Sequence, residues 1–185
     1  MGLEREIKLR FASADEARRR IETLDAVPLR PRRLQRDWLL DDEAGSLQRA
    51  QSTLRVRDEG DRGFLTFKGA PQSGPLKLRE EIEAGVSDAA VLMTILGRAG
   101  FVPRFRYEKY REEYSARQAI IAIDETPVGV FVEIEGVEAR IHELARALGF
   151  APTAYVTKSY RDLFLEKRGA LGLTGPDMVF PRLVE

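Results

Sequence analysis

The chain has 185 residues, of which 43% are hydrophobic, so it suits one domain with a sizeable core and is too apolar to be disordered. Basic and acidic residues number 30 each, and a net charge of zero argues against a general nucleic-acid binder. The absence of cysteine excludes disulfides, thiolate metal sites and cysteine nucleophiles. The sequence shows neither an apolar signal segment nor a run of membrane-spanning length, so we expect a cytoplasmic protein without nucleic-acid or membrane partners.

Strand patterns dominate the first hundred residues, with two helix patterns among them. Apolar and polar side chains alternate in five expected strands, at residues 3–11, 36–40, 52–58, 63–69 and 76–84. One helix is expected at residues 13–24, where Ser13 and Glu16 have capping-box spacing, and another runs from Ser87 to residue 99, before Gly100. Residues 25–36 read as a connector because they contain two prolines, and residues 41–51 read as a polar loop.

The second half repeats this rhythm. Three more strands are expected at residues 107–116, 119–125 and 128–136, and two more helices at residues 137–148 and 158–167. Strands that come in runs favour an antiparallel α+β fold over a doubly wound one. We expect a single domain over residues 1–168, followed by a tail, residues 169–185, that is rich in Gly and Pro and is either disordered or a lid.

Charged residues occupy alternate positions in most of the expected strands. Because side chains alternate across a strand, each charged row lies on one face, opposite an apolar face. Carboxylate pairs occur at Glu4/Glu6, Glu81/Glu83 and Glu133/Glu135, and basic pairs at Arg55/Arg57, Lys77/Arg79 and Lys109/Arg111. An open sheet with one solvated face also alternates, but its polar face usually mixes in Ser, Thr and Gln. Here nearly every such position is ionised.

A closed antiparallel barrel with these rows inward would have a charged interior, while its apolar faces would lie outward under the helices. A barrel of eight strands is wide enough to hold one small ligand. Arg and Lys side chains would bind phosphate oxygens there, and carboxylates would bind Mg²⁺ or Mn²⁺ that bridges to the same phosphates. Ligation by oxygen alone argues against zinc.

The charged motifs also resemble a known family. Residues 4–8, EREIK, are similar to the ExExK signature of the CYTH superfamily, the triphosphate tunnel metalloenzymes. The resemblance continues in order through LRVR, TFK, REEIE, KYR, the DE at residues 124–125, VEIEG and KSYRDL, and so covers about residues 3–165. One departure is the second strand, where many relatives carry a His-x-Asp-x-Tyr-Phe-Asp-like run and this chain has QRDWLLDD.

The resemblance implies an eight-stranded antiparallel β-barrel that forms a tunnel for a divalent metal and a triphosphate. By motif, the implied metal ligands are Glu4, Glu6, Asp124, Glu133 and Glu135. The implied phosphate contacts are Lys8, Arg55, Arg57, Lys68, Arg79, Lys109, Arg111 and Lys158. Glu81, Lys8 and Arg57 are the predicted catalytic residues, with Glu81 positioning the attacking water.

Three functions are compatible with these residues. The leading prediction is a Mg²⁺- or Mn²⁺-dependent hydrolase of an inorganic or organic triphosphate, in which positioning and charge neutralisation supply most of the catalysis. A class IV-like adenylyl cyclase, which would convert ATP to cyclic AMP and pyrophosphate, would use nearly the same residues. A non-catalytic polyphosphate- or nucleotide-binding module ranks last, because it would not require so many paired carboxylates. The assembly state is left open, with a homodimer as one alternative.

Overall fold

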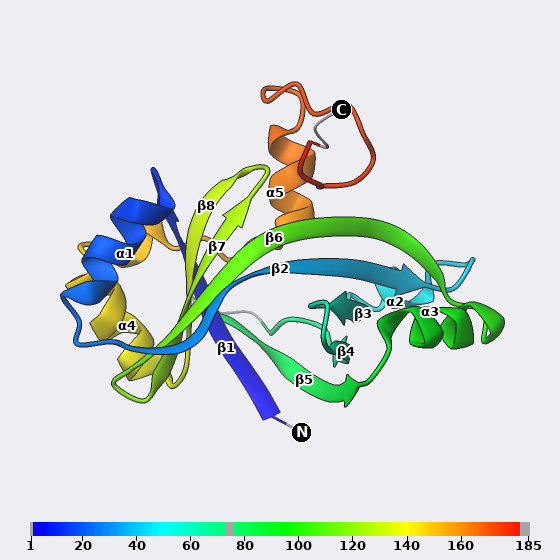
Figure 1. Ribbon diagram of the computed structural model, residues 1–185, viewed down its shortest axis with the longest axis horizontal. Coiled ribbons are helices and arrows are strands. Elements are labelled where there is room, and N and C mark those ends of the chain that lie inside the picture. Colours follow the sequence, from blue (N-terminus) through cyan, green and yellow to red (C-terminus); the bar gives the residue numbers. More distant parts are fainter. Residues whose placement is uncertain (1, 73–75, 182–185) are drawn as a thin grey trace.

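Eight antiparallel strands close into a barrel in the computed structural model, which describes residues 2–72 and 76–181 (Figure 1). The strands are β1 (Gly2–Phe11), β2 (Val27–Asp41), β3 (Thr53–Asp58), β4 (Gly63–Lys68), β5 (Lys77–Val86), β6 (Val102–Ala116), β7 (Ala119–Thr126) and β8 (Gly129–Glu135). Around the ring they follow the order β1-β5-β4-β3-β2-β6-β7-β8. The closed antiparallel barrel predicted from the charged rows, with the eight strands that the family resemblance implies, is therefore confirmed.

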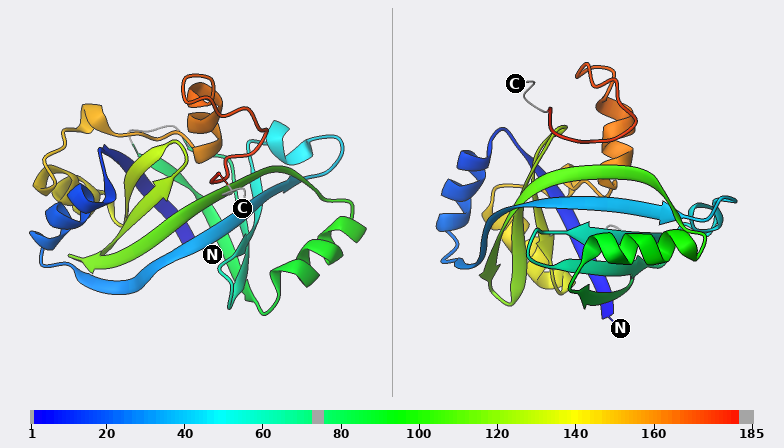
Figure 2. Two further views of the ribbon diagram at one scale, coloured as in Figure 1. Left: turned by 45° about the horizontal axis from the view of Figure 1, so that its top comes forward. Right: turned by 45° about the vertical axis from the view of Figure 1, so that its right-hand side comes forward.

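The helices lie outside the barrel wall or at its rim (Figures 1 and 2). They are α1 (Ala14–Glu22), α2 (Ser46–Arg49), α3 (Ala89–Arg98), α4 (Glu138–Ala147) and α5 (Tyr160–Lys167), with a 3₁₀ turn, η1, at Pro152–Ala154. Side-chain caps begin three of them, because Ser13, Asp88 and Ser159 each accept backbone N–H groups of the first turn. Every helix among the described residues is too short or too polar to cross a membrane.

Several element boundaries differ from the sequence-based expectation. Most of the predicted connector at residues 25–36 instead forms the first two thirds of β2, and β6 begins five residues earlier than expected, at Val102. Pro28 and Pro31 lack an N–H to donate, and β2 accommodates them through register shifts in its pairing with β6. Part of the predicted polar loop forms the short helix α2, and α3 begins at Ala89 because Asp88, rather than Ser87, caps it.

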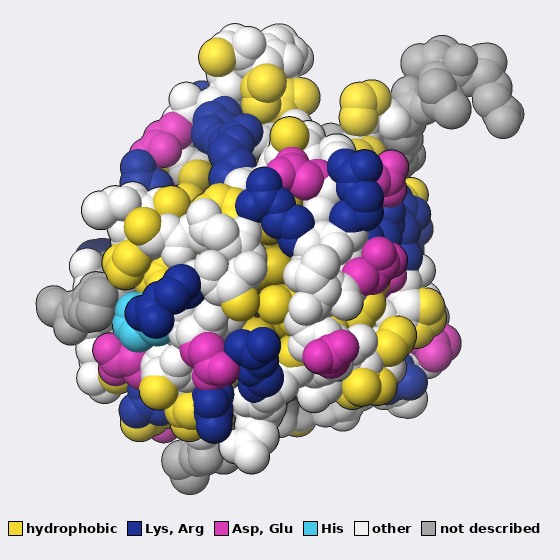
Figure 3. Space-filling view, turned by 90° about the vertical axis from the view of Figure 1, so that its left-hand side faces the viewer, with side chains coloured by type: hydrophobic (Ala, Val, Ile, Leu, Met, Phe, Trp, Pro, Cys, Tyr) yellow, Lys and Arg dark blue, Asp and Glu magenta, His cyan; other side chains and the backbone are white. Residues whose placement is uncertain are grey.

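The main hydrophobic core lies outside the barrel, between its wall and two helices. Ile7 and Leu9 of β1 and Ile134 of β8 are fully buried against Ile21 of α1 and Ile141 of α4. Figure 3 shows the face of the molecule over these helices, where basic and acidic side chains are interspersed. This arrangement leaves the charged rows of the strands on the inside of the ring.

A second core forms where α5 approaches the barrel. Leu163 and Phe164 of α5 pack with Phe105 of β6 and Phe131 of β8, and Met178 of the C-terminal segment is completely buried with them. The segment also pairs with β6, because the N–H of Met178 donates to the carbonyl of Arg106, 3.0 Å away. Met178 therefore forms a single bridge with Tyr107, on the part of β6 that β7 does not reach. Residues 182–185 of the predicted tail lie outside the described residues.

Replacing Ile134 with Ala tests the outer core. The substitution removes a completely buried side chain, so the free energy of unfolding should fall by about 2–5 kcal/mol. Ile120→Ala on β7 is the matched control, because that isoleucine is 43% exposed and its loss should cost about 1 kcal/mol or less. Denaturant titrations of both variants measure the two values, and equal losses would contradict this placement of the core.

Candidate functional site

The inward rows of the strands surround a cavity of about 970 Å³. All but two of the predicted site residues line it, and the exceptions are Asp124 and Lys158. Basic and acidic side chains alternate around the cavity because antiparallel pairing places the charged row of one strand beside that of the next. The barrel thus brings into one space predicted site residues that are up to 131 positions apart in the chain, from Glu4 to Glu135.

The charged side chains of β1 that face the cavity form ion pairs with residues of both neighbouring strands. The ammonium of Lys8 lies 3.1 Å from Glu6 and 3.2 Å from Glu133 of β8. Lys77 of β5 reaches Glu6 at 2.7 Å. Burial opposes ionisation of Glu6, but Lys8 and Lys77 outweigh it and hold the pKa of this carboxyl well below its usual value. Lys8 is therefore a permanent cation, and its own pKa is raised by Glu133 and Glu6 against the effect of burial.

An excess of carboxylates gathers at the Glu4 end of this row. Lys68 of β4 lies between Glu4, at 2.6 Å, and Glu81, at 3.0 Å, and Arg79 also reaches Glu4 at 3.2 Å. Among the described residues Glu135 has no salt-bridge partner, although it faces Glu4, Glu81 and Glu6. Burial first, and these three carboxylates next, raise the pKa of Glu135 to about 7. Lys68 and Arg79 therefore leave part of the negative charge at this end of the cavity uncompensated.

Two arginines on β3 share a carboxylate that sequence reasoning missed. Asp37 of β2 is completely buried and accepts a hydrogen bond from Nε of Arg57 at 2.8 Å, while Nε of Arg55 lies 3.5 Å away. These arginines hold the pKa of Asp37 below its usual value in spite of burial. In the sequence, Asp37 occupies one of the alternate positions of β2 that face the interior of the barrel. Because residues 25–36 were expected to form a connector, the expected strand was too short to reveal that inward-facing row.

Asp124 takes a different place from the one predicted. It accepts hydrogen bonds from Lys109 at 2.7 Å, from Nε of Arg111 at 2.7 Å and from the hydroxyl of Tyr160 at 2.6 Å, and it is completely buried. Its oxygens are thus occupied, and they do not face the cavity. In the structure Asp124 holds Lys109 and Arg111 in position, and its role near a metal stays a prediction.

Lys158 also departs from its predicted role. It is exposed and pairs with Glu166 of α5, so it does not reach the cavity. Tyr160, two residues later, points inward in its place. Its ring lies 5.2 Å from the ammonium of Lys8 and 5.1 Å from that of Lys109. Burial, followed by Asp124, raises the pKa of this phenol well above its usual value, so it stays neutral and can donate to Asp124.

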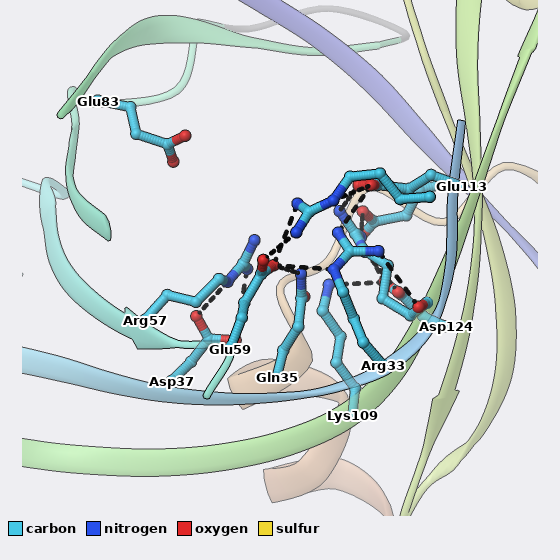
Figure 4. A network of polar contacts seen from close by, with 12 residues as sticks. Arg33, Gln35, Asp37, Arg57, Glu59, Glu83, Lys109, Glu113 and Asp124 are labelled. Atoms are coloured by element: carbon cyan, nitrogen blue, oxygen red, sulfur yellow. Dashed lines mark hydrogen bonds and ion pairs between the residues drawn. The ribbon is translucent and has the colours of Figure 1, made fainter. Parts of the chain in front are cut away.

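A further polar network extends the charged interior (Figure 4). Glu59, just after β3, accepts hydrogen bonds from Gln35 of β2 at 2.5 Å and from Arg30, and Arg33 lies 3.2 Å away. Arg33 also donates to Glu113 of β6 at 2.7 Å. The side chain of Glu59 is only 1% exposed. Sequence parity missed it because it belongs to a turn, where alternation no longer applies.

The five carboxylates predicted as metal ligands do not converge on one point. In residues 2–72 and 76–181, no three Asp, Glu or His side chains are arranged to hold an ion. Glu4, Glu6 and Glu133 are instead paired with Lys and Arg. The unpaired Glu135 and the raised pKa values of Glu135 and Glu81 nevertheless mark a place where added positive charge would be favourable. An all-oxygen donor set fits a hard divalent cation.

Comparison with known proteins places this geometry in a family. The profile of the CYTH domain matches residues 2–160. The chain belongs to the CYTH family. Among curated proteins, a "putative adenylate cyclase" of Methanocaldococcus jannaschii is 28% identical over 176 aligned residues, covering 87% of this chain and 98% of the relative.

Solved structures of other proteins share the fold. That of a "putative adenylate cyclase" from Vibrio parahaemolyticus superposes with a TM-score of 0.78 at 16% identity, covering 88% of this chain and 98% of the other. A "putative adenylyl cyclase" from Hippeastrum, described as having a dominant triphosphatase activity, superposes with a TM-score of 0.66 at 20% identity, covering 90% and 96%.

Removal of the charge on Asp37 tests the arginine pair of this CYTH protein. Asp37→Asn leaves two buried guanidinium groups without their carboxylate, so the free energy of unfolding should fall by about 3 kcal/mol. Asp58→Asn on β3 is the control, because Asp58 and its partner Arg36 are partly exposed and the pair should contribute less than about 1 kcal/mol. Denaturant titration at neutral pH compares them, and a neutral effect of Asp37→Asn would contradict the assigned contact.

The raised pKa of Glu135 predicts a pH dependence. A carboxyl whose pKa is about 7 when folded contributes stability below its ordinary pKa, and that stability is lost as the pH rises through 7. In metal-free buffer, Glu135→Gln should therefore gain stability over the wild type between pH 5 and pH 8.5. The cavity wall partly desolvates the carboxyl of Glu135, but the residue as a whole stays accessible to solvent, so screening should limit the gain to about 1 kcal/mol. The unfolding free energies of the wild type and the variant are measured at both pH values. If the difference between the two proteins were the same at pH 5 and at pH 8.5, the repulsion between Glu135 and the other carboxylates would be contradicted.

Proposed function

We propose that this CYTH protein hydrolyses a triphosphate, inorganic or organic, in its tunnel with the help of a divalent cation, Mg²⁺ or Mn²⁺. The observation that carries the proposal is the set of basic side chains from β1, β3, β4, β5 and β6 that face one cavity. A polyphosphate chain has several charged oxygens along its length, and a cavity lined by Lys and Arg on many strands matches that distribution.

The phosphate contacts would come from side chains that are already positioned. Arg55 and Arg57 are held by Asp37, and Lys109 and Arg111 by Asp124. Each guanidinium has five N–H donors, of which a carboxylate uses only some, so the remaining donors are available to phosphate oxygens. Because these cations are ordered in advance, little side-chain entropy would be lost when the substrate binds.

The cation would be held at the carboxylate end of the tunnel, by Glu4 and Glu135 with Glu6 and Glu133 as further candidates. When bound, a divalent cation neutralises phosphate charge and polarises the phosphoryl oxygen. Its binding would also relieve the repulsion that raises the pKa of Glu135, which is the observation that supports this position.

Glu81 would position the attacking water. Burial, with Glu4 adding to it, raises the pKa of Glu81, and Lys68 fixes the carboxylate at 3.0 Å. A carboxylate with a raised pKa is a better proton acceptor than one in water. Lys8, a permanent cation beside Glu6 and Glu133, would stabilise negative charge on the phosphoryl group during transfer, and Arg57 would do so from the opposite wall.

A class IV-like adenylyl cyclase is the second candidate. The cavity extends beyond the charged rows to the side chains of Leu39, Leu47 and Phe105, which gives room for an organic group on the triphosphate. In that reaction the ribose 3′-hydroxyl attacks the α-phosphate and pyrophosphate leaves. The name of the Methanocaldococcus jannaschii relative favours this candidate, whereas the activity described for the Hippeastrum protein favours hydrolysis.

Product analysis separates the two reactions. Tripolyphosphate, thiamine triphosphate and ATP are incubated in turn with the protein in Mg²⁺ and in Mn²⁺, and the products are resolved by chromatography. Hydrolysis predicts orthophosphate without a cyclic nucleotide, and loss of activity in excess chelator. Cyclic AMP with pyrophosphate would establish the cyclase instead, and the absence of any turnover with all three substrates would contradict both.

Metal binding is tested apart from turnover. Glu4→Gln should weaken Mn²⁺ binding, measured by isothermal titration calorimetry without substrate, by about tenfold or more, because one anionic ligand is lost. Glu83→Gln is the control, since Glu83 lies on the same wall but pairs with Arg55 and is outside the proposed ligand set. Equal Mn²⁺ affinity in the Glu4 variant and the wild type would remove Glu4 from the metal site.

A further inference from the structure

Helix α3 carries an apolar stripe that no part of the described chain covers. Val91 and Ile95 are 55% and 57% exposed, although both are large aliphatic residues. The helix meets the barrel through other side chains, since Leu92, Met93 and Leu96 are half-buried and α3 packs against β3. Figure 2 shows the helix at the surface, with no element over its outer side.

Charged residues of opposite sign lie at the two ends of this stripe. Asp88 precedes the first turn and Arg98 closes the last, and both are exposed. The four positions Asp88, Val91, Ile95 and Arg98 are spaced by three, four and three residues, so they lie along one face of the helix. Asp88 and Arg98 are equidistant from position 93, and so are Val91 and Ile95.

This symmetry makes the stripe complementary to itself. If two such helices pair antiparallel about a two-fold axis near position 93, Val91 meets Ile95 of the partner subunit. In the same arrangement Asp88 meets Arg98 of the partner subunit, and the two charge pairs lie at opposite ends, about 15 Å apart along the helix. A parallel pairing would instead put like charges together. The pattern therefore suits a second copy of the same chain.

We propose that α3 is the centre of a homodimer interface, in which two copies of this chain pair antiparallel through the stripe Asp88–Val91–Ile95–Arg98. One helix pair of this length is smaller than a standard interface of roughly 1,200–2,000 Å², so the dimer dissociates on dilution. This inference is independent of the proposed reaction, because the stripe lies outside the barrel and none of its residues lines the cavity.

Sedimentation velocity of the wild-type chain is the first test. The weight-average mass should rise from the monomer toward the dimer as the concentration increases from about 1 μM to about 1 mM. Ile95→Glu should raise the dissociation constant by about tenfold or more, because it places a carboxylate in the centre of the apolar contact. A wild-type chain that stays monomeric over this range would overturn the proposal, whether or not a different protein binds the stripe.

Val137→Glu is the matched control. Val137, next to α4, is also 57% exposed, and the substitution is of the same kind but lies on another face of the molecule. Its dissociation constant should equal that of the wild type. If Val137→Glu dissociated the dimer and Ile95→Glu did not, the interface would lie elsewhere and the proposal would be wrong.

A charge exchange tests the antiparallel geometry. Arg98→Glu places two acidic residues opposite each other at both ends of the pair, and Asp88→Lys places two basic residues there, so each variant alone should be monomeric. Mixed in equal amounts, they should form a heterodimer, because every end then joins opposite charges. Circular dichroism checks that α3 survives the loss of its cap in Asp88→Lys. Two folded variants that stay monomeric when mixed would overturn the antiparallel pairing.

Discussion

The pairing of buried charges is the constraint on which the rest of this structure depends. A carboxylate or ammonium that leaves water for a protein interior loses several kcal/mol of solvation free energy unless an opposite charge replaces the water. Here the ring order of the strands supplies that replacement. The β1 row of Glu4, Glu6 and Lys8 lies between the basic residues of β5 and the acidic residues of β8, so attraction runs around the wall as well as along β1.

The same constraint explains why the apolar core lies on the outside. Because side chains alternate along a strand, one face of each strand points into the barrel and the other points out. The inner face is charged, so the outer face is apolar and helices must cover it. α1 and α4 cover one part of the wall, where Ile7 and Ile134 are buried. α3 covers another part but leaves Val91 and Ile95 in contact with solvent. Its incomplete burial is thus a consequence of an architecture that turns its hydrophobic faces outward.

Parity and turn signals predicted the strands and their charged faces, because a period of two is a local property of each strand. The order of the charged motifs, through the family resemblance, supplied the eight-stranded tunnel. What they could not supply was the identity of the partners. Asp124 has the inward parity of Glu133, yet one is enclosed by Lys109 and Tyr160 while the other faces the cavity. Glu59 and Tyr160 were missed for a related reason, since a turn and a helix place them inside the barrel and no strand alternation marks them. The metal ligands, the substrate and the reaction remain predictions.

The position of Tyr160 links the C-terminal helix to the charges of the tunnel. Its hydroxyl holds Asp124, its ring lies over the ammonium groups of Lys8 and Lys109, and the rest of α5 packs on the wall of the barrel. Such a linkage is reciprocal. A ligand that draws these cations away from the ring changes the equilibrium constant for docking of α5 on the barrel. The docking of α5 then changes the affinity for that ligand by the same factor. Amide hydrogen exchange at residues 163–167 of α5, which do not line the cavity, is therefore expected to report on its electrostatic state.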